Sequence, residues 1–298
     1  MMKRRAVARE QGGAGVVLYD VARWGVMVGF ALLCLLPFLN IIAVSLTPSI
    51  EYTKNPLIIW PQEPTLDAYR QIVSSSRIFQ SVINSVYITI VGTVSSLFLT
   101  ATYAYGLSKQ GMPGRTVFGT IVIVAMLFGP GIIPLYVVVR GLGLINTYWS
   151  VILSLAIQPF YCVLMRNFFE NIPKDIMESA YIEGATERRI LWSIVLPLSK
   201  AAIAVFTLFY SVFFWNEFFR PLMFLNDPEM WPVQVWLREI VINSSDMRMR
   251  ADDVDNIQMV PEIVKNAVVV VATLPILFVY PFLQKHFAKG LLIGAVKG

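Results

Sequence analysis

Charge is scarce in this sequence. Only 14% of the 298 residues are charged, 56% are hydrophobic, and mean hydropathy is +0.64. A soluble domain carries about 25% charged residues, so the composition excludes an ordinary water-soluble fold. The two cysteines, Cys34 and Cys162, lie within apolar runs and indicate small core residues rather than a disulfide. A single histidine, His286, cannot build a His-rich metal site, so we expect no metal.

A nucleotide-binding site is also missing. No Gly-Lys dipeptide occurs anywhere in the sequence, so the lysine of a phosphate-binding P-loop has no place in it. A membrane enzyme would need a catalytic constellation, and one histidine with two cysteines at lipid depth offers none. We therefore predict that the chain is not an enzyme and holds no cofactor of its own.

Long uncharged stretches are what the sequence has instead. A helix needs about 20 mostly apolar residues to cross a hydrocarbon core about 30 Å thick. Five stretches are uncharged and long enough: residues 24–50, 78–108, 116–139, 141–165 and 266–284. A sixth, less clean stretch begins at Ala201 and meets Glu217 and Arg220 near its outer end, where these two residues could form an ion pair. The sequence therefore predicts an all-α membrane protein with six transmembrane helices within residues 24–284.

The distribution of lysine and arginine predicts the orientation. If the N-terminus is inside, the inside segments carry 15 Lys and Arg against 7 Asp and Glu, and the outside segments carry 9 against 12. Cytoplasmic loops collect Lys and Arg. We therefore expect both termini in the cytoplasm, with tails at 1–23 and 285–298, and a long outside loop at 226–262. The first apolar run is too long for a cleaved signal peptide, and the net charge of +5 then reflects the loops rather than nucleic acid.

Prolines interrupt several of the expected spans. Pro37, Pro130, Pro134, Pro159 and Pro275 all lie inside them, and residues 129–134 form the strongest break. Proline frees a backbone carbonyl and bends a membrane helix. Such a break either shapes the bundle as a static kink or acts as a hinge beside a cavity.

Residues 174–197, on the expected inside, have the pattern of a helix–turn–helix. Pro173 stands at a helix start with Asp175 near the positive end of the helix dipole, and Gly184 stands where a C-cap would end that helix. A second amphipathic stretch follows over 190–195, and Pro197 is expected to open the next spanning helix. The residues alone leave two interpretations open: a docking site for a partner protein or a helix lying on the lipid surface.

A resemblance favours the docking site. Glu-x-Ala, three residues, Gly, nine residues, then Ile-x-Leu-Pro resembles the EAA loop of ABC importer permeases. The pattern departs from the family only at Ser179, where the family usually has alanine. It falls on Glu178, Ala180, Gly184, Ile194, Leu196 and Pro197.

The resemblance extends along nearly the whole chain, to the carbohydrate-uptake permeases that include the second permease subunit of the maltose importer. Phe128 to Pro134 and Arg166 to Phe169 resemble most the branch that imports oligosaccharides of plant or algal polymers, such as rhamnogalacturonan-type and alginate importers. The other matching stretches are Pro64-Thr65-Leu66-Asp67-Ala68-Tyr69, Asn84-Ser85, Leu142-Gly143-Leu144-Ile145-Asn146-Thr147, Trp215-Asn216-Glu217-Phe218 and Pro221-Leu222.

The resemblance implies a type I ABC importer permease fold in a bacterial cytoplasmic membrane. The chain would pair with a homologous second permease subunit, and a dimer of ABC ATPase subunits would bind ATP and Mg²⁺. A periplasmic or extracellular solute-binding protein would deliver the oligosaccharide and meet residues 226–262. Residues 174–197 would form the coupling helix that docks on the ATPase, through Glu178, Ser179, Ala180, Gly184, Ala185, Ile194, Leu196 and Pro197.

Candidate substrate contacts are amides and aromatic rings inside the membrane, where polar groups usually face a bundle interior or a cavity. For any single aromatic residue, helix packing or a place in the interfacial belt is the plainer alternative. An ion-coupled secondary transporter is the second hypothesis for the whole chain, but it would need ionisable residues near the bilayer midplane. The candidates are Asn84, Tyr87, Tyr161, Tyr210, Trp215 and Asn216.

Overall fold

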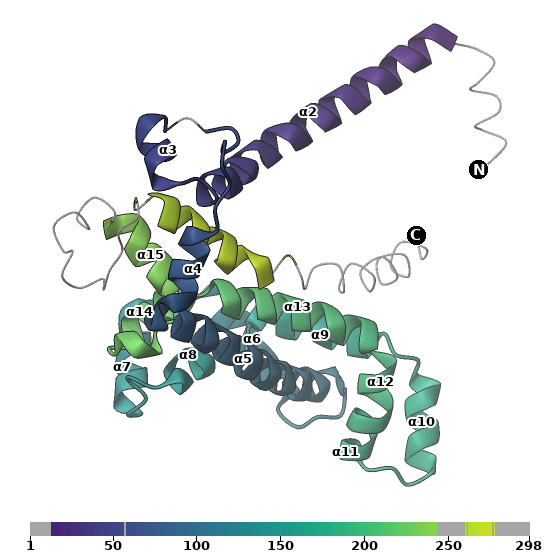
Figure 1. Cartoon of the computed structure of the whole chain (residues 1–298). Helices are drawn as coiled ribbons and strands as arrows, with labels where there is room; N and C mark the ends of the chain where they lie inside the picture. The colour runs from purple at the N-terminus through teal and green to yellow at the C-terminus, as the bar shows by residue number, and fades with distance from the viewer. Residues whose placement is uncertain (1–12, 57, 244–259, 261, 276, 278–298) are drawn as a thin grey trace. The chain divides into compact units, whose positions relative to one another are not determined.

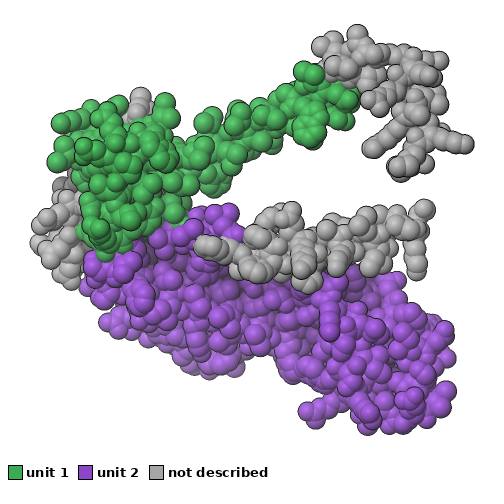
Figure 2. Space-filling model, turned by 45° about the vertical axis from the view of Figure 1, so that its right-hand side comes forward, with its two compact units in different colours: residues 1–71, 249–270 green, residues 72–248, 271–298 purple. Residues whose placement is uncertain are grey.

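The computed structural model describes residues 13–56, 58–243, 260, 262–275 and 277, and the secondary structure of this part of the chain is helical, with connecting loops. Figure 1 labels helices from α2 near the N-terminus to α15 (Val233–Asn243). The chain divides into two units, residues 1–71 with 249–270 and residues 72–248 with 271–298, which Figure 2 colours separately. The predicted all-α class is confirmed.

The first expected span is one long helix, α2 (Gly13–Ser45). Its part from Tyr19 to Ser45 is long and apolar enough to cross a membrane. The predicted end at residue 50 was wrong, because Pro48 adopts an extended conformation and a separate short helix, α3 (Ser49–Lys54), begins after it. Residues 13–23, expected to belong to a tail, are part of α2.

The loop after α2 is held to the end of that helix by polar contacts within the first unit. The Thr65 backbone N–H donates to the Leu46 carbonyl at 2.8 Å, and the Asn40 amide donates to the Ile58 carbonyl at 2.8 Å. The hydroxyls of Ser45 and Tyr69, the latter in α4 (Asp67–Ser74), lie 2.6 Å apart. The expected outside loop is therefore an ordered structure, although its apolar tip around Trp60 is exposed.

The second unit is built around α5 (Ser76–Ser108), the second predicted span, which forms one continuous helix as expected. Its neighbours include α9 (Pro159–Glu170) and α13 (Lys200–Asn216) (Figure 1). Small residues let membrane helices approach closely, and Gly92 does so here. A Cβ at Gly92 would lie 2.7 to 2.8 Å from ring atoms of Phe214 on α13.

Two expected spans are broken helices, which corrects their prediction as single helices. Residues 116–139 form α6 (Arg115–Leu127) and α7 (Ile132–Gly141). The break falls at residues 128–131, where Pro130 cannot donate a helical hydrogen bond and Gly131 has φ +73°. The observed break overlaps residues 129–134, the stretch predicted as the strongest break.

The other broken span is the one expected over residues 141–165. It consists of α8 (Tyr148–Ser154) and α9, whose axes differ by 54°. Pro159 occupies the first turn of α9, a position that proline favours because its missing N–H needs no partner there. Proline therefore marks the start of a new helix rather than a kink within one.

The interruption at Glu217 ends α13 and starts α14 (Phe219–Phe224). The carboxylate of Glu217 pairs with the Arg220 guanidinium at 3.0 Å, which confirms the predicted ion pair. The same carboxylate accepts the backbone N–H groups of Phe219 and Arg220, each at 3.0 Å. Glu217 therefore satisfies free donors at the start of α14.

By length and composition, two described helices could cross a membrane alone, and up to four spans result if each bent pair counts as one. The number six therefore stays a prediction. Residues 262–275 are helical and cover part of the last expected span. The rest of that span, His286, the tail at 285–298, residues 1–12 and most of the acidic part of the 226–262 loop lie outside the described residues.

Both cysteines are free thiols, in agreement with the prediction that they form no disulfide. Cys162 is fully buried in α9, as expected for a small core residue. Cys34 is exposed on α2 and therefore does not belong to the core of the isolated chain. Among the residues that the structure describes, no cluster of His, Cys, Asp and Glu side chains could hold a metal.

Candidate functional site

Residues 174–197, called the 174–197 segment below, form the predicted helix–turn–helix (Figure 1). Its first arm, α10 (Lys174–Ile182), ends in a turn at Gly184, which has φ +77°. The Gly184 N–H donates to the Tyr181 carbonyl at 3.0 Å, and the Ala185 N–H donates to the Ala180 carbonyl at 2.9 Å. These two bonds are the Schellman helix end. The predicted turn at Gly184 is confirmed.

The second arm changes its helical form along its length. It begins with α11 (Glu187–Ile190), continues as a π-helix at Leu191–Val195 and closes with α12 (Leu196–Leu198). Pro197 lies inside this arm, so the prediction that it opens the next spanning helix was wrong. The proline ring crowds the carbonyl four residues earlier, and the wider π turn comes directly before it. The chain then bends by 84° into α13.

The eight residues predicted to couple the chain to a partner divide into exposed and packed groups. Glu178, Ser179, Gly184 and Pro197 are exposed. Ala185, Ile194 and Leu196 are half-buried against the core of the second unit, and Ala180 is buried within it. The exposed group can meet a partner, whereas the packed group holds the segment to the second unit. Ile182 is 87% exposed and adds an apolar contact point at the end of α10.

A cluster of four polar side chains joins the turn of the 174–197 segment to the end of α5. Glu187, the first residue of α11, accepts hydrogen bonds from the hydroxyls of Tyr105 and Tyr181. Lys109 lies 3.3 Å from the Glu187 carboxylate and donates to the Tyr181 hydroxyl at 2.8 Å. Its ammonium group also stands over both rings, 4.6 Å from the Tyr105 centroid and 5.2 Å from that of Tyr181. We call Tyr105, Lys109, Tyr181 and Glu187 the turn cluster.

The turn cluster changes the acidity of its two charged members. Partial burial opposes the ionisation of Glu187, but hydrogen bonds from Tyr105 and Tyr181 and the charge of Lys109 outweigh it and lower the pKa of Glu187. Partial burial likewise opposes the charge of Lys109. Its bonds to the tyrosines and the nearby Glu187 carboxylate nevertheless raise the pKa of Lys109. The carboxylate and the ammonium group are therefore both charged over the physiological range.

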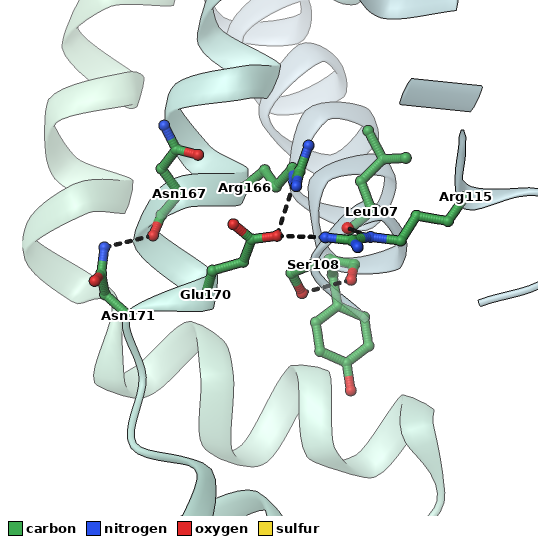
Figure 3. Close-up of polar contacts among 8 residues, drawn as sticks. Leu107, Ser108, Arg115, Arg166, Asn167, Glu170 and Asn171 are labelled. Atoms are coloured by element: carbon green, nitrogen blue, oxygen red, sulfur yellow. Dashed lines mark hydrogen bonds and ion pairs between the residues drawn. The ribbon is translucent and has the colours of Figure 1, made fainter. Parts of the chain in front are cut away.

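A second polar cluster ties α5, α6 and α9 together beside the first (Figure 3). One carboxylate oxygen of Glu170 accepts from the Arg115 guanidinium at 2.7 Å and from Arg166 at 2.9 Å. Arg115 also donates from Nε to the Leu107 carbonyl at 2.8 Å. The Arg166 to Phe169 motif that carried the resemblance thus lies in a contact among three helices.

Asn84, predicted as a substrate contact, anchors the outer loop instead. Its side-chain amide donates to the carbonyls of Glu229 at 2.7 Å and Trp231 at 3.2 Å. Its carbonyl accepts from the Tyr148 hydroxyl at 2.9 Å and from Gln80 at 3.1 Å. Because Asn84 is only 2% exposed and has a partner for each polar atom, this conformation leaves it nothing to offer a sugar.

Neighbouring motif residues anchor the same loop. The Ser85 hydroxyl accepts the Val233 N–H at 2.8 Å. The Asn146 side chain accepts the N–H groups of Asn226 and Asp227 at 3.0 and 3.1 Å, and Asn146 itself has φ +60°. Residues 226–233 of the predicted outside loop are therefore fixed on the described bundle, and the Asn84-Ser85 and Asn146 motifs are explained by this attachment.

The remaining substrate candidates fall into a buried and an exposed pair, with Tyr161 between them. Tyr210 is fully buried, and its hydroxyl lies 2.6 Å from that of Thr100. Trp215 is 5% exposed and donates to the Ala272 carbonyl at 2.8 Å. Both therefore pack the core in this conformation, which corrects their expected availability to substrate. Tyr87 and Asn216 are exposed and stay candidates.

Tyr161 is half-buried in an aromatic cluster. Its ring lies 5.1 Å from that of Tyr210 in an edge-on contact, 5.5 Å from Phe209 and 6.1 Å from Phe206. Such contacts are typical of helix packing in a membrane bundle. Its role as a substrate contact remains a prediction.

The sequence analysis missed Tyr105, Lys109 and Glu187. Tyr105 and Lys109 are separated from Glu187 by 82 and 78 residues, so no local spacing connects them. The one available signal was a spacing of four between Tyr105 and Lys109, which places both on one helical face at the end of an expected span.

Within the second unit, apolar helices pack around α5 and a helix–turn–helix projects at one end, an architecture typical of a membrane permease. The match to a family model identifies the particular family. The model, described as binding-protein-dependent transport system inner membrane component, matches residues 73–293. The chain therefore belongs to this family, as the EAA-loop resemblance implied.

The relatives are sugar permeases. The chain is 45% identical to the polygalacturonan/rhamnogalacturonan transport system permease protein YtcP of Bacillus subtilis, over 94% of this chain and 99% of the relative. It is 29% identical to the arabinooligosaccharides transport system permease protein AraQ of Halalkalibacterium halodurans, over 93% and 98% of the two chains.

Solved structures show the same fold. A chain from the crystal structure of a bacterial ABC transporter that imports the acidic polysaccharide alginate superposes with a TM-score of 0.84. It is 29% identical and covers 93% of this chain and 99% of its own. A chain from a bacterial alginate ABC transporter in complex with an alginate pentasaccharide-bound periplasmic protein is 14% identical, with a TM-score of 0.58 over 90% and 92%. This second likeness concerns the fold alone. The type I ABC permease fold is confirmed.

Proposed function

We propose that the chain is one of two permease subunits of an ATP-driven, binding-protein-dependent importer of oligosaccharides. The observation that carries the proposal is the 174–197 segment, a projecting helix–turn–helix with the EAA-loop spacing and an exposed outer face. In this proposal the segment lies in the cytoplasm and docks on an ABC ATPase through Glu178, Ser179 and Ile182. The chain supplies no ATP site, so ATP and Mg²⁺ bind the ATPase dimer. Both termini are cytoplasmic.

The remaining partners follow from the same arrangement. A homologous second permease would complete the translocation pathway, and residues 226–233, fixed to α5 by Asn84 and Ser85, offer a rigid outer surface to a sugar-loaded binding protein. Apolar side chains are exposed along α2, from Val21 to Leu39. Because a large exposed apolar surface is unfavourable in water, lipid or the second permease would cover these side chains.

We propose uronic-acid-containing oligosaccharides as the substrate class. Two independent comparisons support it: the relative at 45% identity is named for polygalacturonan and rhamnogalacturonan, and the structural match at 0.84 imports an acidic polysaccharide. The relative named for arabinooligosaccharides is less similar, at 29%. Oligogalacturonate and arabino-oligosaccharide are therefore the two substrates to compare.

An ion-coupled carrier is the second candidate function, and the described residues argue against it. Such a carrier needs an ionisable group free to bind its ion. Glu217, the acidic residue that interrupts a predicted span, is already engaged by Arg220 and by two backbone N–H groups. Glu217 instead caps the N-terminus of α14.

Uptake into vesicles tests the proposal. The chain is reconstituted with its co-expressed second permease and ATPase, the binding protein is added outside, and labelled oligogalacturonate uptake is followed with ATP sealed inside. We expect uptake that requires ATP and persists when ionophores collapse the ion gradients. Uptake that needs a gradient but no ATP would establish the carrier instead, and preferred uptake of arabino-oligosaccharide would refute the substrate class alone.

A further inference from the structure

The two arms of the 174–197 segment are held to the permease in different ways. The second arm buries three large apolar side chains, Ile190, Leu191 and Val195, in the core of the second unit. The first arm, α10, buries Ala180 and packs Met177 partly against the same core. These two side chains give α10 less apolar area to bury than the second arm has. Directional contacts therefore add to the packing that orients α10.

The turn cluster supplies those directional contacts. Tyr181 lies in the last turn of α10 and Glu187 begins α11, so the cluster holds the chain on both sides of the Gly184 turn. Glu187 accepts a hydrogen bond from Tyr105 of α5 and pairs with Lys109, the residue that follows α5. Tyr181 accepts a hydrogen bond from Lys109 and donates one to Glu187. Hydrogen bonds with a charged partner are stronger and more directional than neutral ones. Since Lys109 also stands over the two tyrosine rings, moving α10 would break several contacts at once.

The α5 end of this cluster is itself fixed. Within the same turn of helix, the Leu107 carbonyl accepts from Arg115, which is paired with Glu170 of α9 (Figure 3). Tyr105 also packs edge-on against Phe169 of α9, with ring centroids 6.5 Å apart. The end of α5 is therefore joined to α6, to α9 and to the turn of the 174–197 segment.

We propose that Tyr105 and Lys109 are positioning residues for coupling, which orient α10 and its exposed Glu178 and Ile182 by holding Tyr181 and Glu187. A displacement of α10 by a docked ATPase is then passed directly to the end of α5, and from there to α6 and α9. This role in coupling rests on the proposed function, whereas the orientation of α10 by the turn cluster does not.

The first experiment measures amide hydrogen exchange on the full chain in detergent. Tyr105→Phe removes one hydroxyl and keeps the ring. Lys109→Met removes the positive charge and keeps a side chain of similar length. Tyr103→Phe is the matched control, because the Tyr103 hydroxyl donates to the Phe118 carbonyl of α6 and not to the segment. We expect exchange at residues 177–185 to accelerate about threefold to tenfold in the two cluster variants and to stay unchanged in the control.

Two results of this experiment would overturn the proposal. One is wild-type exchange at 177–185 in both cluster variants. The other is equal acceleration throughout α5 and α9, which would mean general destabilisation. Tyr105→Phe keeps the test valid if Lys109→Met fails to fold.

The second experiment measures oligosaccharide imported per ATP hydrolysed, using the reconstituted complex. We expect this ratio to fall about threefold or more in both cluster variants, with the Tyr103→Phe control at the wild-type value. An unchanged ratio despite faster exchange would refute the positioning role. If the wild-type complex imports nothing, the proposed function fails, and the exchange result still decides whether the cluster orients α10.

Discussion

The turn at Gly184 allows a sharp prediction, because the structure separates backbone strain from steric contact. Gly184 has φ +77°, and a Cβ there would meet nothing within 4 Å. Substitution therefore costs only the strain of a left-handed conformation, roughly 1–2 kcal/mol for an ordinary residue and more for a β-branched one. The native turn would then be populated roughly 5- to 30-fold less with an ordinary residue at position 184, and we expect it to be populated still less in Gly184→Val.

Gly184→Asn is the matched control, because asparagine tolerates the left-handed region and also adds a side chain to the exposed face. We expect Gly184→Val to lose hydrogen-exchange protection at the Gly184 turn and to co-purify poorly with the ATPase, while Gly184→Asn keeps the protection. If both variants fail to co-purify with the ATPase although Gly184→Asn keeps its exchange protection, the partner surface excludes any side chain at position 184. Wild-type protection in the valine variant would refute the strain argument itself.

Two further predictions concern the outer anchor and the pH response of the turn cluster. Asn84→Ala removes the donor of two hydrogen bonds, to the carbonyls of Glu229 and Trp231, so we expect residues 226–233 to open more easily by about 1–3 kcal/mol. Limited proteolysis measures this against Thr102→Ala, whose hydroxyl bonds only within α5, and equal cleavage of the two would contradict it. The pKa of Glu187 is lowered from its ordinary 4.5. The stabilisation that the charged carboxylate gives to the turn cluster is therefore fully present above pH 4.5 and is lost as the pH falls through the lowered pKa. Exchange protection at 177–185 should stay constant from about pH 7 to about pH 5 and decline only below the ordinary pKa of 4.5, unlike in Glu187→Gln, and a decline between about pH 7 and about pH 5 would refute this assignment.

Local patterns in the sequence predicted local features of the structure correctly. The Gly184 turn depends on one residue that tolerates φ +77° and on bonds to carbonyls within five residues of it. The Glu217–Arg220 pair depends on a spacing of three. The break at residues 128–131 depends on a proline and two glycines. Each of these follows from backbone geometry within one or two helical turns.

Two of the substrate candidates illustrate that a polar residue in an apolar helix does not reveal its partner. Asn84 was predicted to touch sugar, but its partners, Glu229 and Trp231, are 145 and 147 residues away. Trp215 likewise bonds to Ala272. A buried polar group must find a hydrogen-bond partner. The sequence predicts that a partner is needed but does not show which residue it is.

The sequence by itself determined that this chain is a helical membrane protein with a helix–turn–helix of EAA-loop spacing, because apolar length and the spacing of short motifs are local properties. Only the tertiary structure decided which side chains hold that segment and which face outward. Tyr105, Lys109 and Glu187 meet because the packing of α5 against the rest of the second unit brings distant parts of the chain to one place. That meeting depends on long-range packing, and no pattern within a window of the sequence encodes it.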